Sequence, residues 1–593
     1  MQCSGKTGAK KFLPMSRAEM SARHWDALDV LLITGDAYVD HPSFGTALIG
    51  RVLEADGLRV GIIAQPDWRT VESLKIMGAP RLFCGVTAGN IDSMVANYTA
   101  GRHKRREDAY TENREIGKRP NHAATVYAQM CRQAFPGVPV VLGGIEASLR
   151  RVAHYDYWED KLRPSILVDS KADILVYGMG EHQVREIARR LQTPERDLSG
   201  IPGTARLLGA KASAAMDFSQ WIRLPSWEEV RDNKVLLLKL TKLVEREQTP
   251  YCGRPLVQFH HDRAVIMERP AMPLDEVEMD ALYDLPFVKE PHFRYQGEIA
   301  GFKTIKDSII VQRGCPGGCT FCGLGFHQGK FLTSRSEKSI LKEIRQLSDS
   351  PNFRGTISDL GGPTANLYGS EHSYDEACHR CRRPSCLYPD ICRHFKIGEE
   401  QMLSLYRHAR ASEGIKHVFI QSGIRMDVAL RTPKYMKELV AHHVSGHLKV
   451  APEHVNPEVL RRMRKPAGVF EKFMEVFREE SEQADKEQYL VPYFISSFPG
   501  CTTREMGDVE KVLQRTHWNL QQVQDFIPLP MTPSAAMYVT GLDYDTETPI
   551  PVVRNAGERL AQIKVLRPNF GEKKPARPSN QAAPESDTAP DAF

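Results

Sequence analysis

The first half of the chain alternates between short apolar runs and amphipathic segments. Apolar runs typical of buried strands occupy residues 28–35, 59–65, 81–87, 138–144 and 172–178. Helical spacing of apolar residues fills 46–57, 123–135 and 181–191. Strands that are apolar throughout and separated by helices are typical of a parallel sheet covered on both faces. We therefore predict a Rossmann-like, doubly wound α/β domain over 25–195, preceded by an N-terminal extension at 1–24.

A second alternation begins near residue 301. Its strand candidates are 307–313, 355–362, 416–423, 447–454, 489–500 and 521–530, with helical patterns between them at 336–347, 432–443 and 502–516. Six such units predict a partial (β/α)6 barrel over 301–570, with its chemistry at the carboxyl ends of the strands. Residues 196–300 form an intermediate region without a clear boundary. The tail at 571–593 is rich in Pro, Ala, Ser and charged residues, and we expect it to be disordered.

Composition and charge narrow the function classes. The chain has 593 residues, 41% of them hydrophobic and 26% charged, which is typical of a globular protein. A net charge of +5 gives no argument for nucleic acid, and the basic run at 102–106 is more often a solvated face than a phosphate site. No apolar run is long enough for a membrane span, and no signal peptide is evident. We therefore expect a cytoplasmic location, where the twelve cysteines would not form a disulfide scaffold and clusters of them would bind metal.

Three of these cysteines crowd into one glycine-rich stretch, "QRGCPGGCTFCGLG" at 312–325. Cys315, Cys319 and Cys322 have a number and spacing that suit zinc or an iron–sulfur cluster. A structural zinc site is closed by four ligands, and His327 is the nearby residue that could complete one. The Cys-x3-Cys-x2-Cys spacing in a tight loop instead favours three corners of an iron–sulfur cubane, with the fourth iron open.

The segment "CPGGCTFC" resembles the signature of the radical S-adenosylmethionine (SAM) superfamily, including Phe321 before the last cysteine. The resemblance implies a [4Fe–4S] cluster on Cys315, Cys319 and Cys322, whose open iron binds the amino and carboxylate groups of SAM. An electron from the cluster then breaks the sulfonium bond and yields a 5′-deoxyadenosyl radical. It also implies a reducing partner such as a flavodoxin or ferredoxin. The substrate stays unknown.

Four later motifs resemble cofactor-binding segments of the same superfamily. In "SDLGGPT" (358–364), Gly361 and Gly362 would meet the methionyl amino group through backbone carbonyls, since Pro363 stands where an acidic residue is common. Arg425 in "QSGIRMD" is a candidate contact to the cofactor. "FPGCTTRE" (498–505) and "FIPLPMTP" (526–533) would cradle adenine and ribose, and Phe321 would pack near the adenine.

The amino-terminal half carries a narrower resemblance. "FLPMSRAEM", "LITGDAYVDHPSFGTALIGRVLEADG" and "GIIAQPDW" are similar to the YgiQ-type (UPF0313) group of radical SAM proteins. The predicted sheet also resembles the cobalamin-binding domain that precedes many radical SAM barrels. The Asp-x-His-x-x-Gly motif that supplies a histidine to cobalt is absent, because Asp40 and His41 are adjacent and Gly45 lies four residues after His41. Cobalamin is therefore not favoured; base-off cobalamin, a substrate or no ligand are the alternatives.

A second cysteine group lies in a predicted insertion at 372–395. It consists of Cys378, Cys381, Cys386 and Cys392. Four thiols in fifteen residues can close a zinc site or hold an auxiliary iron–sulfur cluster, and free thiols are the third alternative. The paired start, Cys-x2-Cys, favours zinc, and the interleaved arginines would offset thiolate charge: Arg380, Arg382, Arg383 and Arg393.

Two functions from different classes follow. The first is a radical SAM enzyme, and the second is a zinc-stabilised nucleic-acid-binding protein without radical chemistry, whose basic segments at 102–106 and 379–393 contact RNA. The glycine-rich cysteine loop at the end of a barrel strand favours the enzyme. No residue identifies itself as acting on the substrate, although Glu453 and His454 in "APEH" are candidates for lining the site.

Overall fold

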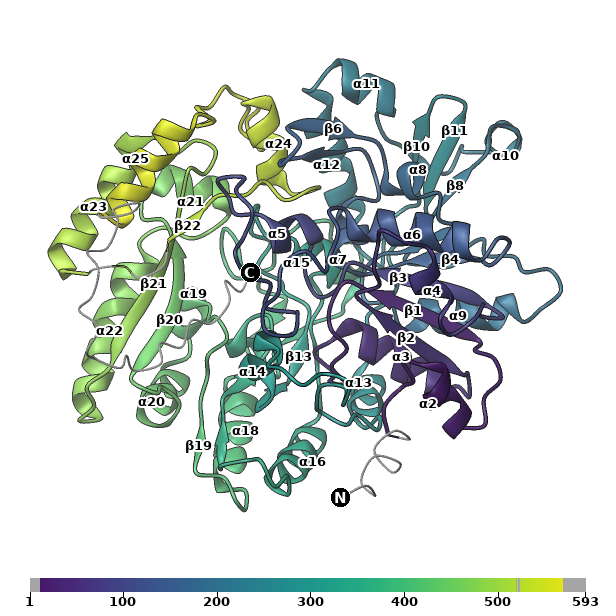
Figure 1. Cartoon of the computed structure of the whole chain (residues 1–593). Coiled ribbons are helices and arrows are strands. Elements are labelled where there is room, and N and C mark those ends of the chain that lie inside the picture. The colour runs from purple at the N-terminus through teal and green to yellow at the C-terminus, as the bar shows by residue number, and fades with distance from the viewer. Residues whose placement is uncertain (1–10, 519, 521–522, 569–593) are drawn as a thin grey trace, which may run out of the picture.

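A computed structural model describes residues 11–518, 520 and 523–568 (Figure 1). The chain folds into two halves that lie side by side, an amino-terminal half around one large sheet and a carboxyl-terminal half around a curved row of strands. The predicted disordered tail lies outside the described residues. So do residues 1–10 of the predicted extension and residues 521–522 of the last strand candidate.

The large sheet has the strand order β2-β1-β3-β4-β7-β8-β11-β10-β9. Its first five strands are parallel: β1 (Val30–Thr34), β2 (Val60–Ala64), β3 (Phe83–Thr87), β4 (Val140–Leu142) and β7 (Ile174–Val176). All of β1 is buried, with Leu31 and Ile33 in one core cluster and Val30 and Leu32 in another. Alternate residues of the strand thus face two separate cores, which explains its uninterrupted apolar run.

Helices cover both faces of this sheet. On one face, α3 (Gly45–Ala55) packs against α9 (Glu181–Leu191), and on the other α6 (Ala123–Ala134) contacts β3 and β4. This arrangement confirms the predicted doubly wound sheet.

The region at 196–300 contributes four more strands to the same sheet. They are β8 (Thr204–Leu208), β9 (Ile222–Arg223), β10 (Leu256–His260) and β11 (Arg263–Met267). β8 pairs antiparallel with β7 and with β11, and β10 and β11 form a hairpin. The sheet therefore changes from parallel to antiparallel at β7, and α11 (Trp227–Asp232) and α12 (Leu236–Glu247) lie between β9 and β10 in the chain.

All six strand positions predicted for the second half occur in the structure. β12 (Ser308–Ile310) pairs with β16 (Asp359–Gly361), and β15 (Thr356–Ile357) pairs with β19 (His417–Val418). A parallel bridge between Ile424 and Val450 leads to β20 (His447–Glu453), which pairs in turn with β21 (Tyr489–Ser496) and β22 (Gln524–Asp525). Every pair is parallel, and no pairing among the described residues joins β12 to β22. The row is thus an open barrel.

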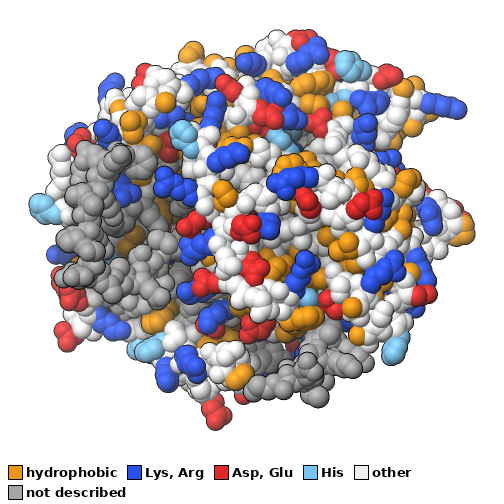
Figure 2. All heavy atoms as spheres, viewed as in Figure 1, with side chains coloured by type: hydrophobic (Ala, Val, Ile, Leu, Met, Phe, Trp, Pro, Cys, Tyr) orange, Lys and Arg blue, Asp and Glu red, His pale blue; other side chains and the backbone are white. Residues whose placement is uncertain are grey.

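The barrel helices follow the predicted pattern. They are α16 (Glu337–Ser348), α18 (Glu399–Ala411), α20 (Pro433–His442), α22 (Val469–Gln483) and α23 (Thr503–Thr516). In the part of the chain that the structure describes, no helix is long and apolar enough to cross a membrane. Figure 2 shows acidic and basic side chains interspersed over the described surface of one face, as the small net charge of +5 suggests.

Shorter elements lie between these strands and helices, among them the hairpin of β5 (His154–Asp156) and β6 (Lys161–Arg163) and the helix α19 (Met426–Ala429). In the amino-terminal half they also include α2 (Arg17–Ala22), α4 (Glu72–Lys75), α8 (Ile166–Ser170), α10 (Ala210–Ala215), α13 (Glu276–Tyr283) and α14 (Ala300–Ile305), and in the second half α21 (Pro457–Met463), α24 (Pro533–Thr540) and α25 (Ala556–Leu566).

Candidate functional site

The three-cysteine segment forms a tight loop at the end of the first barrel strand. It follows β13 (Gln312–Arg313), leads into α15 (Leu324–His327), and is closed by β14 (Thr333–Ser334), which pairs antiparallel with β13. Gly314 has a φ of +84°, and a Cβ on it would lie 2.0 Å from the carbonyl oxygen of Phe331. Only glycine fits there, so the sequence closes the loop at this residue.

The three thiols lie half-buried in this loop. The Sγ of Cys315 is 3.6 Å from Oγ1 of Thr364, and the Sγ of Cys319 is 3.7 Å from Nη1 of Arg425. Burial raises the pKa of the Cys319 and Cys322 thiols. A Cβ on Gly317 would lie 3.4 Å from the Sγ of Cys315 and 3.8 Å from that of Cys319. The glycine thus keeps a space beside two of the thiols.

The distances between the thiols discriminate between metals. A tetrahedral zinc with Zn–S bonds of about 2.3 Å holds its thiolates about 3.8 Å apart. A cubane holds them farther apart, because each thiolate binds a different iron. Among the described residues, no metal-ligating group within 4.8 Å of one another includes these three cysteines together. The donor set and the glycine cradle therefore fit a cluster.

His327, the fourth ligand of the zinc alternative, is engaged elsewhere. Its Nδ1 lies 3.0 Å from the hydroxyl of Ser148 on α7 (Gly144–Leu149). Burial lowers the pKa of His327 to about 4, so the imidazole is neutral at pH 7.

The glycine motif after the second barrel strand packs against the third-strand segment. A Cβ on Gly361 would lie 2.7 Å from Oγ of Ser422, and one on Gly362 would lie 2.9 Å from the carbonyl oxygen of Gln312. The carboxylate of Asp359 accepts the backbone N–H groups of Gln421 and Ser422 at 2.8 and 3.0 Å. The structure thus brings the segments 358–364 and 421–427 together, as the order of the motifs predicted.

Arg425 is fixed beside the cysteine loop. Its Nε and Nη2 donate to the two carboxylate oxygens of Asp427 at 2.9 and 2.6 Å, which leaves Nη1 directed at the thiol of Cys319. The side chain of Asn366 accepts the backbone N–H of Arg425 and donates to its carbonyl, both at 2.8 Å. Asn366 is fully buried, and no motif in the sequence had marked it.

Phe321 connects the loop to the last two barrel strands. Its ring meets Phe498 edge-on, with centroids 6.4 Å apart, and Phe498 meets Phe526 at 5.3 Å. The hydroxyl of Thr320 donates to the carbonyl of Arg462, and the backbone N–H of Ser534 donates to the carbonyl of Thr320. The cysteine loop therefore touches the segment 498–505 at Phe498, and it touches Ser534, which directly follows the segment 526–533.

Glu453 and His454 end the fourth strand in different surroundings. Glu453 adopts a left-handed φ of +66°, and Nζ of Lys465 lies 3.2 Å from its buried carboxylate, whose pKa burial raises. The charge of Lys465 offsets part of the rise that burial gives to the pKa of the Cys319 thiol, so Lys465 is a cation near the cysteine loop that sequence patterns did not reveal. Nε2 of His454 lies 3.4 Å from the Sγ of Cys501. The imidazole of His454 is therefore directed at the segment that follows the fifth strand.

A cavity of about 990 Å³ lies between the two halves. Its walls come from the carboxyl ends of the large sheet and from the barrel, and they include Thr87, Asn90, Gly143, Gly178, Glu181, Gln312, Arg313, His327, Gly361, Gly362 and Ser422. Such a crevice beyond the strand ends is where ligands of doubly wound sheets bind. Among the described residues, neither the three cysteines nor Arg425 nor Phe321 lines it, so the cavity lies beside the loop.

Three buried side-chain oxygens of cavity-lining residues lack hydrogen bonds among the described residues. They are Oε2 of Glu181, Oε1 of Gln312 and the hydroxyl of Tyr283. The other oxygen of Glu181 accepts from Arg313 at 2.6 Å, and Nε2 of Gln312 donates to the carbonyl of Thr364 at 2.6 Å. A buried acceptor without a donor is costly, which favours a ligand that offers N–H or O–H groups.

His41, the histidine nearest to a cobalt-binding motif, does not face this cavity in the described structure, although its neighbours Pro42 and Ser43 line it. Its Nδ1 accepts the backbone N–H of Ser43 at 3.1 Å, and burial lowers its pKa to about 3. His41 therefore serves the local turn.

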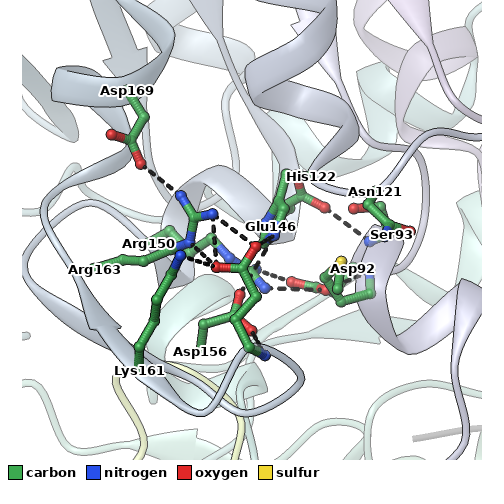
Figure 3. Close-up of polar contacts among 12 residues, drawn as sticks. Asp92, Ser93, Asn121, His122, Glu146, Arg150, Asp156, Lys161, Arg163 and Asp169 are labelled. Atoms are coloured by element: carbon green, nitrogen blue, oxygen red, sulfur yellow. Dashed lines mark hydrogen bonds and ion pairs between the residues drawn. The ribbon is translucent and has the colours of Figure 1, made fainter. Parts of the chain in front are cut away.

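A polar network behind the cavity fixes one wall (Figure 3). Glu146 on α7 accepts the backbone N–H of Ser93, which begins α5 (Ser93–Asn97), and that of Ala124 on α6, at 2.8 and 3.0 Å. Arg150, just after α7, forms a buried ion pair with Asp92. These bonds hold Gly143, Gly144 and Ile145 at the cavity.

Three side chains near this network, His122, Asp156 and Glu159, have metal-ligating atoms within 4.8 Å of one another, and Figure 3 labels the first two. Glu159 already pairs with Arg163 at 2.7 Å and with Lys161 at 2.9 Å. The neighbouring positive charges make this group unsuitable for a cation.

The basic run at 102–106 has structural partners. Nε of Arg105 donates to the carbonyls of Val95 and Tyr98 at 2.9 and 3.1 Å, and the guanidinium of Arg102 stacks 4.5 Å from the ring of Tyr157. These contacts account for two of its arginines without a nucleic acid.

Two family profiles together match residues 12–510. The family described as radical SAM N-terminal matches residues 12–308, and the radical SAM superfamily matches residues 309–510. The second match spans the cysteine loop and the first five barrel strands. It supports the radical enzyme, and nothing found supports the nucleic-acid-binding alternative.

Curated relatives are similar over nearly the whole chain. A UPF0313 protein of Rhodopseudomonas palustris is 48% identical over 94% of this chain and 85% of its own length. One of Geobacter sulfurreducens is 48% identical over 94% of this chain and 92% of its own length. The UPF0313 protein YgiQ of Shigella flexneri is 46% identical over 90% and 80%.

One similar solved structure is the radical SAM methyltransferase TsrM of Kitasatospora setae with cobalamin and a [4Fe–4S] cluster bound. Its TM-score is 0.47 at 15% identity, and the match covers 86% of this chain and 77% of that chain. The cobalamin-dependent radical SAM enzyme OxsB is similar with a TM-score of 0.46 and 11% identity, over 88% and 56%. No conclusion about the present chain rests on likenesses this distant.

The family matches and the geometry of the cysteine loop lead to one assignment. The protein is a radical SAM enzyme, which works with a [4Fe–4S] cluster and SAM. Because relatives at 44–48% identity cover most of the chain, the assignment extends to the narrower group. The chain belongs to the UPF0313 (YgiQ-type) family of the radical SAM superfamily.

Proposed function

We propose that Cys315, Cys319 and Cys322 hold the [4Fe–4S] cluster of this enzyme and leave its fourth iron for SAM. The observation that supports this most strongly is the three-thiol loop itself, with its glycine cradle and no fourth protein thiol in the motif. When bound, the cluster supplies the electron that splits SAM into methionine and a 5′-deoxyadenosyl radical.

The residues around the loop have distinct tasks in this proposal. Arg425 and Lys465 place two positive charges near Cys319, which offsets the negative charge of the thiolates. Gly361 and Gly362 present backbone to SAM without a side chain in the way. Phe321, with Phe498 and Phe526, forms an apolar wall suited to the adenine.

The substrate, in the same proposal, occupies the cavity between the two halves. The cavity adjoins the glycine motif, because Gly361, Gly362 and Pro363 line it. Its wall combines apolar and polar side chains, and oxygens of Glu181 and Gln312 on it lack hydrogen-bond donors among the described residues. Such a cavity suits a large ligand that is partly apolar and carries N–H or O–H groups. Enclosure by both halves would keep water from a radical intermediate.

A cytoplasmic location and a low-potential electron donor complete the proposal. Thiol-ligated clusters and eleven described free cysteines suit a reducing compartment. A flavodoxin or ferredoxin is the class of donor that could deliver single electrons to the cluster.

The experiment compares Cys319→Ala with Cys131→Ala, a buried cysteine of the amino-terminal half. Both proteins are purified and reconstituted without oxygen, and iron and 5′-deoxyadenosine are measured after addition of dithionite and SAM. We expect Cys319→Ala to lose about four irons per chain and all 5′-deoxyadenosine, while Cys131→Ala keeps both. Unchanged iron and nucleoside in Cys319→Ala would reject the ligand assignment.

A further inference from the structure

The second cysteine group sits in a loop that is closed on itself. β17 (Glu371–His372) pairs antiparallel with β18 (Phe395–Lys396), so the two ends of the segment between them are held together. Its one described helix is the four-residue α17 (Glu376–His379). A segment this short and irregular has little apolar core of its own, and loops of this kind are commonly held by a metal.

This loop packs directly on the three-cysteine loop. The backbone N–H of Cys386 donates to the carbonyl of Pro316 at 2.9 Å. The hydroxyl of Ser385 lies within hydrogen-bond distance of the carbonyls of Pro316 and Gly317, at 3.0 and 2.8 Å. A Cβ on Gly318 would lie 2.8 Å from the carbonyl oxygen of Pro384. The two cysteine groups are therefore neighbours in space, although Cys322 and Cys378 lie far apart in the sequence.

Two of the four thiols lie beside the strand that closes this loop. The Sγ of Cys386 is 3.8 Å from Nδ1 of His372, and the Sγ of Cys378 is 3.3 Å from Oγ of the next residue, Ser373. The backbone N–H of Cys392 donates to the carbonyl of Cys386 at 2.8 Å, and that of Cys381 donates to the carbonyl of Cys378 at 3.1 Å. The four cysteines thus come from two hydrogen-bonded turns of this loop.

A buried cation accompanies the four thiols. Lys330 is 7% exposed, and its Nζ donates to the carbonyls of Cys381 and Arg383 at 3.4 and 2.7 Å. No carboxylate among the described residues forms an ion pair with it. A buried ammonium without an anion is costly, and thiolates bound to a metal would supply the missing negative charge.

We infer that Cys378, Cys381, Cys386 and Cys392 hold a second iron–sulfur cluster of the [4Fe–4S] type, which fastens this loop onto the three-cysteine loop. Four thiolates suit such a cluster. In the described structure these four do not form a set within 4.8 Å, whereas a tetrahedral zinc holds its thiolates about 3.8 Å apart. The three described cysteines of the first loop do not form such a set either.

A zinc site is the competing assignment, and the structure names its ligands. Asp375, Cys378 and His394 bring ligand atoms within 4.8 Å of one another. Nδ1 of His394 lies 2.7 Å from the carboxylate of Asp375, and Nε of Arg393 donates to Nε2 of His394 at 3.1 Å. Both nitrogens of His394 therefore have partners already. This group includes only one of the four thiols, which is why we place the metal on the cysteines.

The test uses two full-length variants and counts metal in each. Cys315→Ala/Cys319→Ala/Cys322→Ala removes the first group, and Cys378→Ala/Cys381→Ala removes half of the second. After anaerobic reconstitution, iron, zinc and the electron paramagnetic resonance signal of the reduced protein are measured. We expect about eight irons per chain in the unchanged protein, about four in each variant, and a different signal left in each.

The triple variant decides the question even if the double variant fails to fold, because it leaves the second group intact. About four irons with no zinc in the triple variant support the second cluster. No iron there, with or without one zinc per chain, overturns it. Asp375→Asn/His394→Ala is the matched control, and it should keep all the iron; loss of zinc from it would assign the metal to that group instead.

The inference stands apart from the proposed function, and the two can fail separately. If the triple variant holds no iron while the unchanged protein holds about four, the first cluster stands and the second falls. If the triple variant keeps all the iron of the unchanged protein, the first assignment falls and the second stands.

Discussion

Arg313 and Glu181 form a buried ion pair, with Nη1 and Oε1 2.6 Å apart, that joins the two halves of the enzyme. Arg313 is the last residue of β13 before the cysteine loop, and Glu181 begins α9 after strand β7. Both line the cavity. The position of the loop relative to the amino-terminal sheet therefore depends on this pair.

Removal of one partner of this ion pair should lower the free energy of unfolding. Glu181→Gln leaves Arg313 buried without a counter-charge, and breaking a buried pair in this way costs about 3–5 kcal/mol. We expect Glu181→Gln to unfold at a lower urea midpoint than the unchanged protein. The double variant Glu181→Gln/Arg313→Met should lose less free energy of unfolding than the two single variants lose together. The control is Glu72→Gln, since Glu72 and Lys75 form an exposed pair worth at most about 1 kcal/mol. Equal midpoints for Glu181→Gln and Glu72→Gln would contradict the role of the pair.

The contact between the two cysteine loops can be tested with a pair of glycines. Gly318 (φ +63°) and Gly329 (φ +81°) both have left-handed backbone, but a Cβ meets Pro384 and Ser385 only at Gly318 and nothing within 4 Å at Gly329. Alanine should cost about 1–2 kcal/mol of backbone strain at either position. We expect only Gly318→Ala to lower the iron content as well, because it pushes the loops apart. Iron loss of the same size in Gly329→Ala would assign the effect to strain alone.

The charge of Arg425 should matter for the cluster. Its Nη1 lies 3.7 Å from the Sγ of Cys319, so Arg425→Gln removes a positive charge beside a ligand and makes the cluster harder to reduce. We expect a lower reduction potential in an anaerobic titration followed by electron paramagnetic resonance, and more than half of the shift restored in Arg425→Lys. The exposed Arg431→Gln is the control. A potential unchanged by Arg425→Gln would argue against its placement at the cluster.

Acidification should destabilise the protein through its buried histidines. Burial lowers the pKa of His327 from 6.5 to about 4, so between these pH values the unfolded chain binds a proton that the folded chain does not. The stability is thus present above pH 6.5 and is lost as the pH falls toward 4, by about 2 kcal/mol between pH 7 and pH 5 for this one residue. Urea midpoints of His327→Gln should fall less over this range than those of the unchanged protein. His261→Gln, at an exposed site, should leave the slope unaltered.

Much of the fold was predictable because it depends on local pattern. The uninterrupted apolar run at 28–35 requires burial on both faces, and β1 has its residues in two separate cores. The six strand positions after residue 301 followed from apolar runs between helical patterns, and the structure pairs them in chain order. The region at 196–300 has no clear boundary in the sequence, because the place of its hairpin, β10 and β11, in the large sheet depends on pairing with β8, which the pattern does not indicate.

The candidate site also has one part that the sequence predicts and another part that only the tertiary structure shows. The sequence by itself determined the cysteine loop, because the spacing of Cys315, Cys319 and Cys322 and the glycines between them are local properties of one turn. Only the tertiary structure placed Lys465 and Asn366 around that loop, enclosed the cavity between the halves, and set the second cysteine group against Pro316 and Gly317. Those contacts join residues tens to hundreds of positions apart, and they depend on packing between elements, which a local pattern does not encode.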